Sequence, residues 1–201
     1  MKNKEFFTDY INSFLEQNSK INLISKNDEK FLWEKHIFDS LSIDNFFEKY
    51  NVPTQNIELL DFGTGGGFPS VPIALYYPKI KVTAVDSIRK KINAISNIKE
   101  TLKIDNLTPI CCRVETLNKK FDIITSRAVA SLDKIIEYAM PLLKKDGYFV
   151  AYKSVKAQEE IENARQVLRK YHANVVGTIE YNLPLDENHT RNLIIIKKIT
   201  I

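Results

Sequence analysis

The clearest chemical signal in the sequence is a cluster of glycines that follows an acidic residue. The stretch "DFGTGGGFPS" at 61–70 holds four of the six glycines in the chain of 201 residues. Asp61 stands two residues before a Gly-x-Gly-x-Gly spacing made by Gly63, Gly65 and Gly67. Glycine adopts positive φ without strain and leaves no side chain between the backbone and a ligand. The stretch therefore predicts a loop whose backbone closely approaches a bound molecule.

Three classes of ligand compete for this loop. A phosphate loop of the NTPase type needs Gly-Lys followed by Ser or Thr, and no lysine lies between 61 and 78. A dinucleotide site needs Gly-x-Gly-x-x-Gly, and its last glycine would fall on Phe68 or Ser70. The observed spacing is typical of S-adenosylmethionine-dependent methyltransferases. Asp61 suits the ammonium group of that zwitterionic cofactor, directly or through water, whereas it would repel a pyrophosphate.

A second acid closes the next predicted strand. Asp86 lies 19 residues after Gly67, where a carboxylate can accept hydrogen bonds from both hydroxyls of a ribose. The same residue could instead cap the helix that begins near Ile88. Nucleotide and methyl-donor sites both use such an acid. Because strand, glycines and acid occur in register, we expect Asp86 to bind the ribose of the cofactor.

The elements that must position these residues alternate between strands and helices. The predicted strands span 57–62, 81–86, 107–112, 121–126 and 147–153, and the predicted helices 68–77, 87–102, 132–143 and 157–170. Two closing strands, 173–181 and 191–199, have the pattern of an antiparallel pair. This order predicts an α/β fold of the class I methyltransferase (Rossmann-like) type. Its sheet is mostly parallel, with helices on both faces.

The first quarter of the chain has a purely helical pattern. Apolar residues up to Leu15 build one stripe, a second helix is predicted at 35–49, and a turn follows at 51–56. We therefore divide the chain into a helical N-terminal cap at 1–55 and a cofactor-binding domain at 56–201. We expect the two parts to form one compact unit.

Composition limits the classes of function further. Hydrophobic residues make up 44% and charged residues 27% of the chain, as in ordinary soluble globular proteins. No run approaches the roughly 20 apolar residues that span a bilayer, so we expect no membrane association. The only cysteines, Cys111 and Cys112, are adjacent and indicate a reducing cytoplasm. The net charge of +4 hints at a polyanionic partner, although a lysine-rich solvated surface gives the same charge.

The absence of two sequence motifs reduces the number of possible methyl acceptors. Methylation of an exocyclic amine of a base needs Asn/Asp-Pro-Pro-aromatic after the fourth strand, where this chain has "SRAVA" at 126–130. Methylation of a base carbon needs a cysteine nucleophile near the same strand end, whereas the cysteines lie on the third predicted strand. Acceptors with a free lone pair remain, and guanine N7 is one of them. It carries no proton, so proximity and orientation would supply most of the catalysis.

Longer motifs resemble one methyltransferase family. "LLDFGTGGGFPSVPIAL", "VDSIRKKINAI", "CCRVE" and "ITSRAVA" are similar to the small-subunit rRNA guanine-N7 methyltransferases, also called glucose-inhibited division protein B (RsmG/GidB). "HIFDSL" at 36–41 resembles the helical N-terminal signature of that family. The resemblance implies a monomeric enzyme that methylates N7 of a guanine in the 530 loop of 16S rRNA, in the small ribosomal subunit.

The resemblance also implies site positions. The family's cofactor positions fall on Gly63, Phe68, Val114, Glu115 and Arg127. Val114 and Glu115 would lie beside the adenine of the cofactor. The chain departs from the family at Ser70 and Ser154, where glycine is usual.

Several other polar residues have two interpretations. Arg127 stands where the substrate is expected; it could bind a phosphate, orient the base or form an ion pair with a nearby acid, and we expect a functional role. The candidate RNA contacts are Arg113, Lys153 and Arg191. We expect His36, three residues before Asp39, to be a buried, hydrogen-bonded packing residue. No cluster has metal-ligand spacing, so no metal is expected.

Other functions fit the same residues. The chain could methylate another RNA or a small molecule, or it could be a non-catalytic regulator that only binds the cofactor. A nicotinamide-dependent dehydrogenase is the weakest alternative because the glycine spacing does not match.

Overall fold

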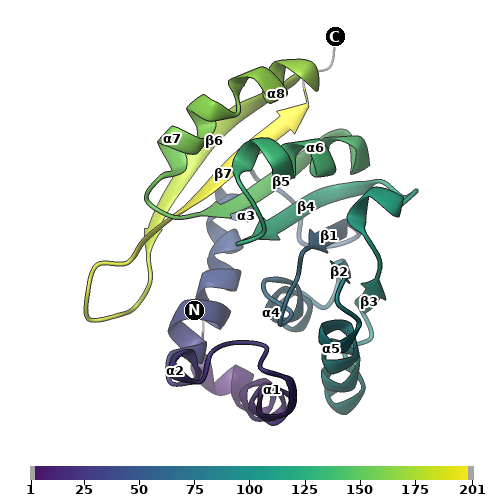
Figure 1. Ribbon diagram of the computed structural model, residues 1–201, viewed down its shortest axis with the longest axis vertical. Helices are drawn as coiled ribbons and strands as arrows, with labels where there is room; N and C mark the ends of the chain where they lie inside the picture. The colour runs from purple at the N-terminus through teal and green to yellow at the C-terminus, as the bar shows by residue number, and fades with distance from the viewer. Residues whose placement is uncertain (1–2, 199–201) are drawn as a thin grey trace.

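The computed structural model describes residues 3–198 and contains a seven-stranded sheet with helices on both faces (Figure 1). Ile199, the last residue of the predicted closing strand, lies outside the described residues. The strands are β1 (Glu58–Phe62), β2 (Lys81–Asp86), β3 (Leu107–Cys111), β4 (Phe121–Arg127), β5 (Leu143–Lys153), β6 (Ala173–Asn182) and β7 (Thr190–Lys198). The predicted fold class is confirmed.

The strand order in the sheet is β3-β2-β1-β4-β5-β7-β6. The strands β1 to β5 pair in parallel, and β7 runs antiparallel to both β5 and β6. The predicted antiparallel pair of closing strands is therefore confirmed. The carboxyl ends of the parallel strands meet at one edge of the sheet, which is where open α/β sheets bind ligands.

The helices form two layers. They are η1 (Lys4–Phe7), α1 (Thr8–Ile21), α2 (Lys26–Glu29), η2 (Leu32–Phe38), η3 (Leu41–Ile43), α3 (Asp44–Lys49), α4 (Ser70–Tyr76), α5 (Arg89–Leu102), η4 (Val114–Thr116), α6 (Leu132–Leu142), α7 (Ala157–Asn163) and α8 (Arg165–Lys170). In Figure 1, α6, α7 and α8 cover one face of the sheet, and α1, α4 and α5 cover the other. Strand β7 shows how both faces are filled: Leu193 and Ile195 join one buried cluster, and Ile194 and Ile196 join the other.

The N-terminal helices share a core with the sheet. Phe7, Tyr10 and Phe14 are buried in the same cluster as Leu59 of β1 and Ile123 of β4. The side chains of residues before the predicted boundary at 55/56 therefore pack directly on one face of the sheet.

The segment that precedes β1 is less regular than predicted. The expected helix at 35–49 is divided among a π-helical turn, a 3-10 turn and α3. Ser40 Oγ donates to the His36 carbonyl at 2.6 Å, and Ser42 Oγ donates to the Phe38 carbonyl at 3.1 Å. Hydroxyls that bond to the preceding turn compete with the regular backbone ladder. Wide turns of this kind are common at functional sites.

Two further elements differ from their predicted bounds. The expected helix at 157–170 is interrupted at Ala164, whose ψ of −4° separates α7 from α8. Strand β5 begins at Leu143 instead of 147, because Leu143 pairs with Phe121 of β4. The expected helix at 132–143 consequently ends at Leu142.

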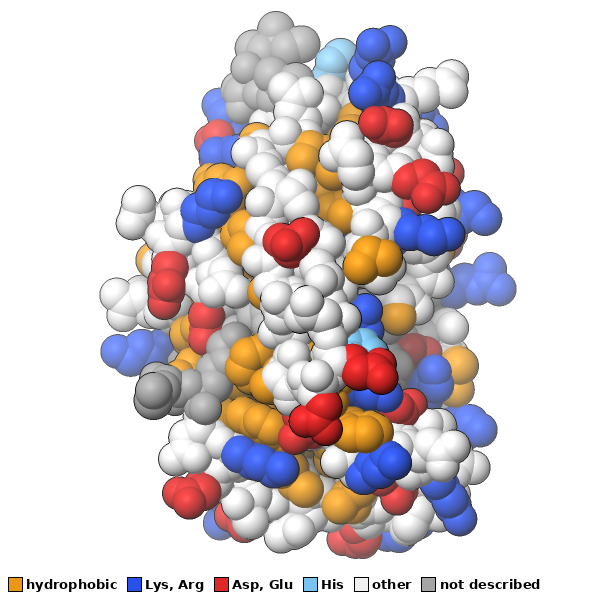
Figure 2. All heavy atoms as spheres, turned by 90° about the vertical axis from the view of Figure 1, so that its left-hand side faces the viewer, with side chains coloured by type: hydrophobic (Ala, Val, Ile, Leu, Met, Phe, Trp, Pro, Cys, Tyr) orange, Lys and Arg blue, Asp and Glu red, His pale blue; other side chains and the backbone are white. Residues whose placement is uncertain are grey.

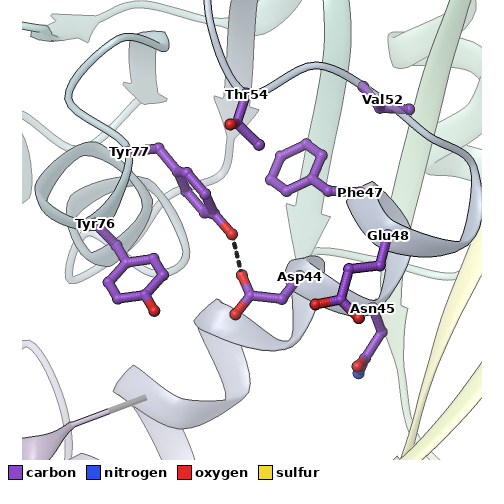
Figure 3. A pocket seen from close by; sticks show the side chains of 8 residues that line it. All are labelled: Asp44, Asn45, Phe47, Glu48, Val52, Thr54, Tyr76 and Tyr77. Carbon is purple, nitrogen blue, oxygen red and sulfur yellow. Dashed lines mark hydrogen bonds between the residues drawn. The ribbon is translucent and has the colours of Figure 1, made fainter. Parts of the chain in front are cut away.

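One cavity of about 490 Å³ lies at the opposite edge of the sheet, beside residues that precede β1 and β2. Figure 3 shows that the side chains of Asp44 and Tyr77 point toward each other there, and the Tyr77 hydroxyl donates to the Asp44 carboxylate. Burial and this neighbouring carboxylate raise the pKa of Tyr77. The cavity faces the amino ends of the strands, away from the glycine loop.

Candidate functional site

Two adjoining cavities lie at the carboxyl edge of the sheet. The first, here called the loop cavity, has a volume of about 460 Å³ and is lined by Gly63, Asp86, Arg113, Val114 and Glu115 among others. The second, here called the arginine cavity, has a volume of about 700 Å³ and is lined by His36, Asp39, Arg127, Lys153, His189 and Arg191 among others. The predicted site residues therefore divide between two neighbouring cavities.

The glycine loop has the backbone conformation that its sequence predicts. Gly63, Gly65 and Gly67 have φ values of +67°, +58° and +92°. The loop is tied to β2, because the Gly65 N–H donates to Asp86 Oδ2 at 2.9 Å. The Thr64 N–H also donates to the Val85 carbonyl at 3.0 Å. These bonds hold Gly63 at the wall of the loop cavity.

Asp86 lies at the cavity and also holds the backbone before the next helix. Its carboxylate lines the loop cavity, and Oδ1 accepts from the Ile88 N–H at 2.9 Å. That bond fixes the turn before α5, although the N-cap position itself is Ile88. An ionised carboxylate has about four lone-pair sites. Asp86 thus accepts hydrogen bonds from the glycine loop and from the turn before α5, and its remaining lone pairs can accept hydrogen bonds from a ligand in the cavity.

Asp61 lies behind the glycine loop and lines neither cavity. The carboxylate is fully buried; it accepts from the Thr125 hydroxyl at 3.0 Å and from the Ser70 N–H at 3.3 Å. Burial raises the pKa of Asp61 to about 6, against the opposing effect of these hydrogen bonds. In this position Asp61 joins the start of α4 to β4.

Phe68 is also buried behind the loop. Its ring packs against Phe14 at a centroid distance of 5.1 Å and against His36 at 5.0 Å. The guanidinium carbon of Arg127 lies 5.2 Å from the centroid of the same ring. Phe68 therefore connects the glycine loop to the N-terminal helices and to Arg127.

Arg127 is held by three groups of the N-terminal segment. Its Nη1 donates to Asp39 Oδ2 at 2.8 Å and to the Lys35 carbonyl at 3.2 Å. Its Nη2 lies 3.1 Å from His36 Nδ1. The Tyr181 hydroxyl donates to the other oxygen of Asp39 at 2.7 Å. The ion pair that the sequence left as an alternative is present, and it is mostly shielded from water.

His36 is a neutral, half-buried side chain in this network. Burial and the charge of Arg127 lower its pKa to about 4. A guanidinium only donates, so His36 Nδ1 accepts and the ring proton belongs on Nε2. Within residues 3–198 the buried Nε2 has no hydrogen-bond partner. The expected packing histidine is thus hydrogen-bonded at only one of its nitrogens.

The candidate RNA contacts lie in different surroundings. Lys153 is nearly buried, and its Nζ donates to Glu160 at 2.6 Å and to the Ala130 carbonyl at 2.7 Å. Arg191 is half-buried in the arginine cavity, and no carboxylate of the described chain pairs with it. Arg113 is exposed and lines the loop cavity instead. The structure therefore brings Lys153 and Arg191 together but separates Arg113 from them.

Three residues of this site were not predicted from the sequence. Asp39 had a signal, since it stands three residues after His36 in the "HIFDSL" motif. Val129 also had one, because it belongs to "SRAVA" and lines both cavities. Tyr181 had none, because only the pairing of β6 with β7 brings it to Asp39.

The charges on the face shown in Figure 2 are mixed. Lys and Arg side chains are interspersed with Asp and Glu side chains instead of forming a patch of one sign. Among residues 3–198, no group of three or more His, Cys, Asp or Glu side chains is placed to hold a metal ion. No helix within the same range is long and apolar enough to cross a membrane.

Comparison with known proteins identifies close relatives. The family model for GidB, described as rRNA small subunit methyltransferase G, matches residues 3–197. The chain is 37% identical over 202 residues to the ribosomal RNA small subunit methyltransferase G of Staphylococcus saprophyticus, with 98% of this chain and 83% of that protein covered. It is 38% identical over 200 residues to the protein of the same name from Staphylococcus aureus strain JH9, with 97% and 82% covered.

Solved structures agree on the fold. Magnesium protoporphyrin IX methyltransferase from Synechocystis PCC 6803, crystallised with bound SAH, superposes with a TM-score of 0.66 at 13% identity, covering 98% of this chain and 97% of that one. An S-adenosylmethionine-dependent methyltransferase from Clostridium acetobutylicum gives 0.61 at 16% identity, covering 94% and 99%. At this identity the likeness shows the class I methyltransferase fold.

Proposed function

The chain belongs to the GidB family of rRNA small subunit methyltransferase G, and from this premise we propose that it methylates N7 of a guanine in the 530 loop of 16S rRNA. One observation supports the proposal beyond the family: the loop cavity and the arginine cavity meet at a shared wall, Ala128 and Val129. A methyl donor in one cavity and a nucleotide in the other would face each other across that wall.

The residues of the loop cavity fit S-adenosylmethionine. Gly63 lets the backbone form the cavity wall, where a Cβ would lie 2.3 Å from Val129 Cγ2. Asp86 presents a carboxylate to the cavity, as a ribose requires. Val114 and Glu115 line the same cavity on the 3-10 turn η4, as adenine neighbours would. We propose that these four residues contact the cofactor.

The other predicted cofactor residues have supporting positions. Gly65 and Gly67 supply the positive-φ turns of the loop, and Asp61 and Phe68 pack behind it. We propose that they shape the wall of the cofactor site, and that Arg127 closes it on the side of the arginine cavity. A water-mediated link from Asp61 to the cofactor ammonium remains part of this proposal.

The proposed reaction needs no general base. Bound S-adenosylmethionine supplies an electrophilic methyl group on a sulfonium sulfur. The N7 lone pair of guanine forms the new N–C bond as the S–C bond breaks, and the electron pair of that bond stays on sulfur. N7 carries no proton, and His36 Nδ1 is already engaged by Arg127. The chain therefore contributes orientation and exclusion of water, which are worth many orders of magnitude in rate.

Charge pairing selects Arg191 as the phosphate contact. In the arginine cavity Lys35, Arg127 and Lys153 each pair with a carboxylate at 2.6–2.9 Å, whereas Arg191 is unpaired within the described chain. An unpaired guanidinium can neutralise an RNA phosphate without first breaking an ion pair. We propose that Arg191 makes this contact and that Arg113 meets RNA at the outer rim. Lys153 would contact RNA only by leaving Glu160.

The experiment is an assay of N7 methylation. Small ribosomal subunits from a strain that lacks this gene, purified protein and labelled S-adenosylmethionine should give one labelled guanine per subunit. Borohydride and aniline should then cleave the rRNA chain at that N7-methylated nucleotide. We propose a monomeric cytoplasmic enzyme, so the protein should sediment as a monomer. Label in another RNA or a metabolite, with none in the small subunit, would overturn the substrate.

A further inference from the structure

Two consecutive residues form the wall between the cavities. Among residues 3–198, Ala128 and Val129 alone line both the loop cavity and the arginine cavity. The two cavities therefore adjoin at this pair. The pair directly follows Arg127, the last residue of β4.

Val129 is seated on the glycine loop. A Cβ on Gly63 would lie 2.3 Å from Val129 Cγ2, so the valine occupies the space that any other residue at 63 would need. The Val129 side chain is nevertheless 41% exposed, because both cavities open onto it. A β-branched side chain has a restricted χ1, so its methyl groups have a fixed place. The Val129 methyl groups therefore form an apolar surface of defined shape where the two cavities meet.

Ala128, which precedes Val129, has an uncommon backbone conformation. Its φ is +55°, in the left-handed region that L-residues with a Cβ avoid. Of the other non-glycine residues with positive φ in the described chain, four are Asn or Asp, and Lys103 and His172 terminate helices. Ala128 has neither reason. Strain of this kind persists only where the surrounding structure imposes it, and it clusters at functional sites.

The turn is anchored on both sides. Before it, Arg127 is bonded to Asp39, Lys35 and His36. After it, the Ala130 carbonyl accepts from Lys153 Nζ at 2.7 Å. The residues on both sides of the wall are therefore hydrogen-bonded to other parts of the chain.

We propose that Val129 is the positioning residue for the methyl acceptor: the shape of its side chain sets the opening between donor and acceptor and fixes the approach of the nucleophilic nitrogen. This inference rests on the proposed methyltransferase function. It assigns to Val129 a steric role, with no chemical step, so a side chain of the same shape should replace it.

A series of substitutions tests the shape. Val129→Phe narrows the opening and Val129→Ala widens it, and we expect each to lower single-turnover methyl transfer about 100-fold at saturating cofactor, because a displacement near 1 Å has that effect. Val129→Thr keeps the shape, and its rate should stay within about twofold of wild type. Val176→Phe is the matched control, since Val176 is 43% exposed on β6 and lines neither cavity.

Cofactor affinity is measured alongside by titration calorimetry. Losses in Val129→Phe and Val129→Ala that persist at saturating cofactor, with Val129→Thr and Val176→Phe active, would support the inference. Rates within twofold of wild type in the Phe and Ala variants would overturn it, as would losses that disappear when the cofactor concentration is raised. A wild-type protein that transfers no methyl group to the small subunit would instead overturn the proposed function.

Discussion

The Arg127 guanidinium lies 2.8 Å from the Asp39 carboxylate, and this contact joins the end of β4 to the N-terminal helical segment. The side chains are 15% and 6% exposed, so water barely screens the pair. Tyr181 of β6 donates to the second oxygen of Asp39, which brings three distant parts of the chain to one point. The position of Arg127 at the arginine cavity therefore depends on residues outside the sheet strand that carries it.

Removing the charge of Asp39 should destabilise the protein. Asp39→Asn leaves Arg127 as an uncompensated buried charge, and breaking such pairs costs about 3 kcal/mol of the free energy of unfolding. For a chain of this size the melting temperature should fall by roughly 6–12 °C. Glu16→Gln is the control, because the Lys20–Glu16 pair is similarly short, at 2.7 Å, but exposed. A melting temperature of Asp39→Asn as high as that of Glu16→Gln would contradict this.

Substitution in the glycine loop should act on the cofactor. In Gly63→Ala the new Cβ would meet Val129 Cγ2 at 2.3 Å, and the φ of +67° is strained for alanine. The loop or Val129 must move, so we expect cofactor affinity, measured by titration calorimetry, to fall at least about tenfold. Gly66→Ala is the control, since the nearest atom is 3.3 Å away and φ is not positive. Equal affinities of the two variants would argue against Gly63 in the cavity wall.

These two sites show what the sequence could predict. The glycine loop could be predicted because its spacing and its positive φ values are properties of consecutive residues. The Arg127 network was not, because Asp39 and Tyr181 meet Arg127 only after the sheet has formed. Likewise, the sequence suggested Lys153 as an RNA contact, but it could not show that Glu160 lies 2.6 Å from its ammonium group.

The helix interruptions could not be predicted from the sequence pattern either. The apolar stripe at 35–49 is compatible with one regular helix, and only the Ser40 and Ser42 hydroxyl bonds reveal the irregular turns. The strand pattern was easier to predict, because alternation and apolar runs directly reflect burial on both faces of the sheet.

Asp61 should make stability depend on pH. Its pKa is about 6 in the folded protein against 3.8 for an ordinary aspartate, so the folded state holds this proton more tightly. The stability contribution is therefore full below about pH 4 and is lost as the pH rises through about 6, by about 3 kcal/mol. His36, whose pKa is lowered to about 4, contributes a rise of opposite sign over the same pH range in both proteins. The free energy of unfolding of the wild type minus that of Asp61→Asn, measured by urea unfolding at each pH, should therefore show this fall.

A second aspartate provides a control of opposite sign. Hydrogen bonding from Ser131 lowers the pKa of Asp133, so its contribution to stability is present above pH 3.8 and is lost as the pH falls through its folded pKa. The free energy of unfolding of the wild type minus that of Asp133→Asn should show no such fall between pH 4 and 6. A wild-type protein whose pH profile over that range matches Asp61→Asn would contradict the assigned burial of Asp61.

Arg191 should govern RNA affinity through its charge. Arg191→Gln removes one phosphate contact, so binding to small-subunit rRNA should weaken and the slope of log K against log salt should decrease by about one. Filter binding at several salt concentrations measures both quantities. Arg165→Gln removes an exposed cation on α8 that lines neither cavity and should leave the slope unchanged. Identical slopes for the two variants would exclude Arg191 as the contact.

The cap at 1–55 and the domain at 56–201 should unfold together, because Phe7 and Phe14 share a buried cluster with Leu59. The single tryptophan, Trp33, packs against Phe7 and Phe38 and so reports on the N-terminal part. Its fluorescence and the far-UV circular dichroism of the whole chain should show the same midpoint in urea. Separate midpoints would show that the cap unfolds independently.

The most direct measurement is the site of methylation in the small ribosomal subunit. Subunits from a strain lacking this gene are incubated with the purified protein and labelled S-adenosylmethionine, and the 16S rRNA is cleaved with borohydride and aniline at N7-methylguanine. The proposed function predicts one labelled guanine in the 530 loop, with cleavage of the rRNA chain at that nucleotide. Label at another atom or another nucleotide, or cofactor binding without any transfer, would contradict it.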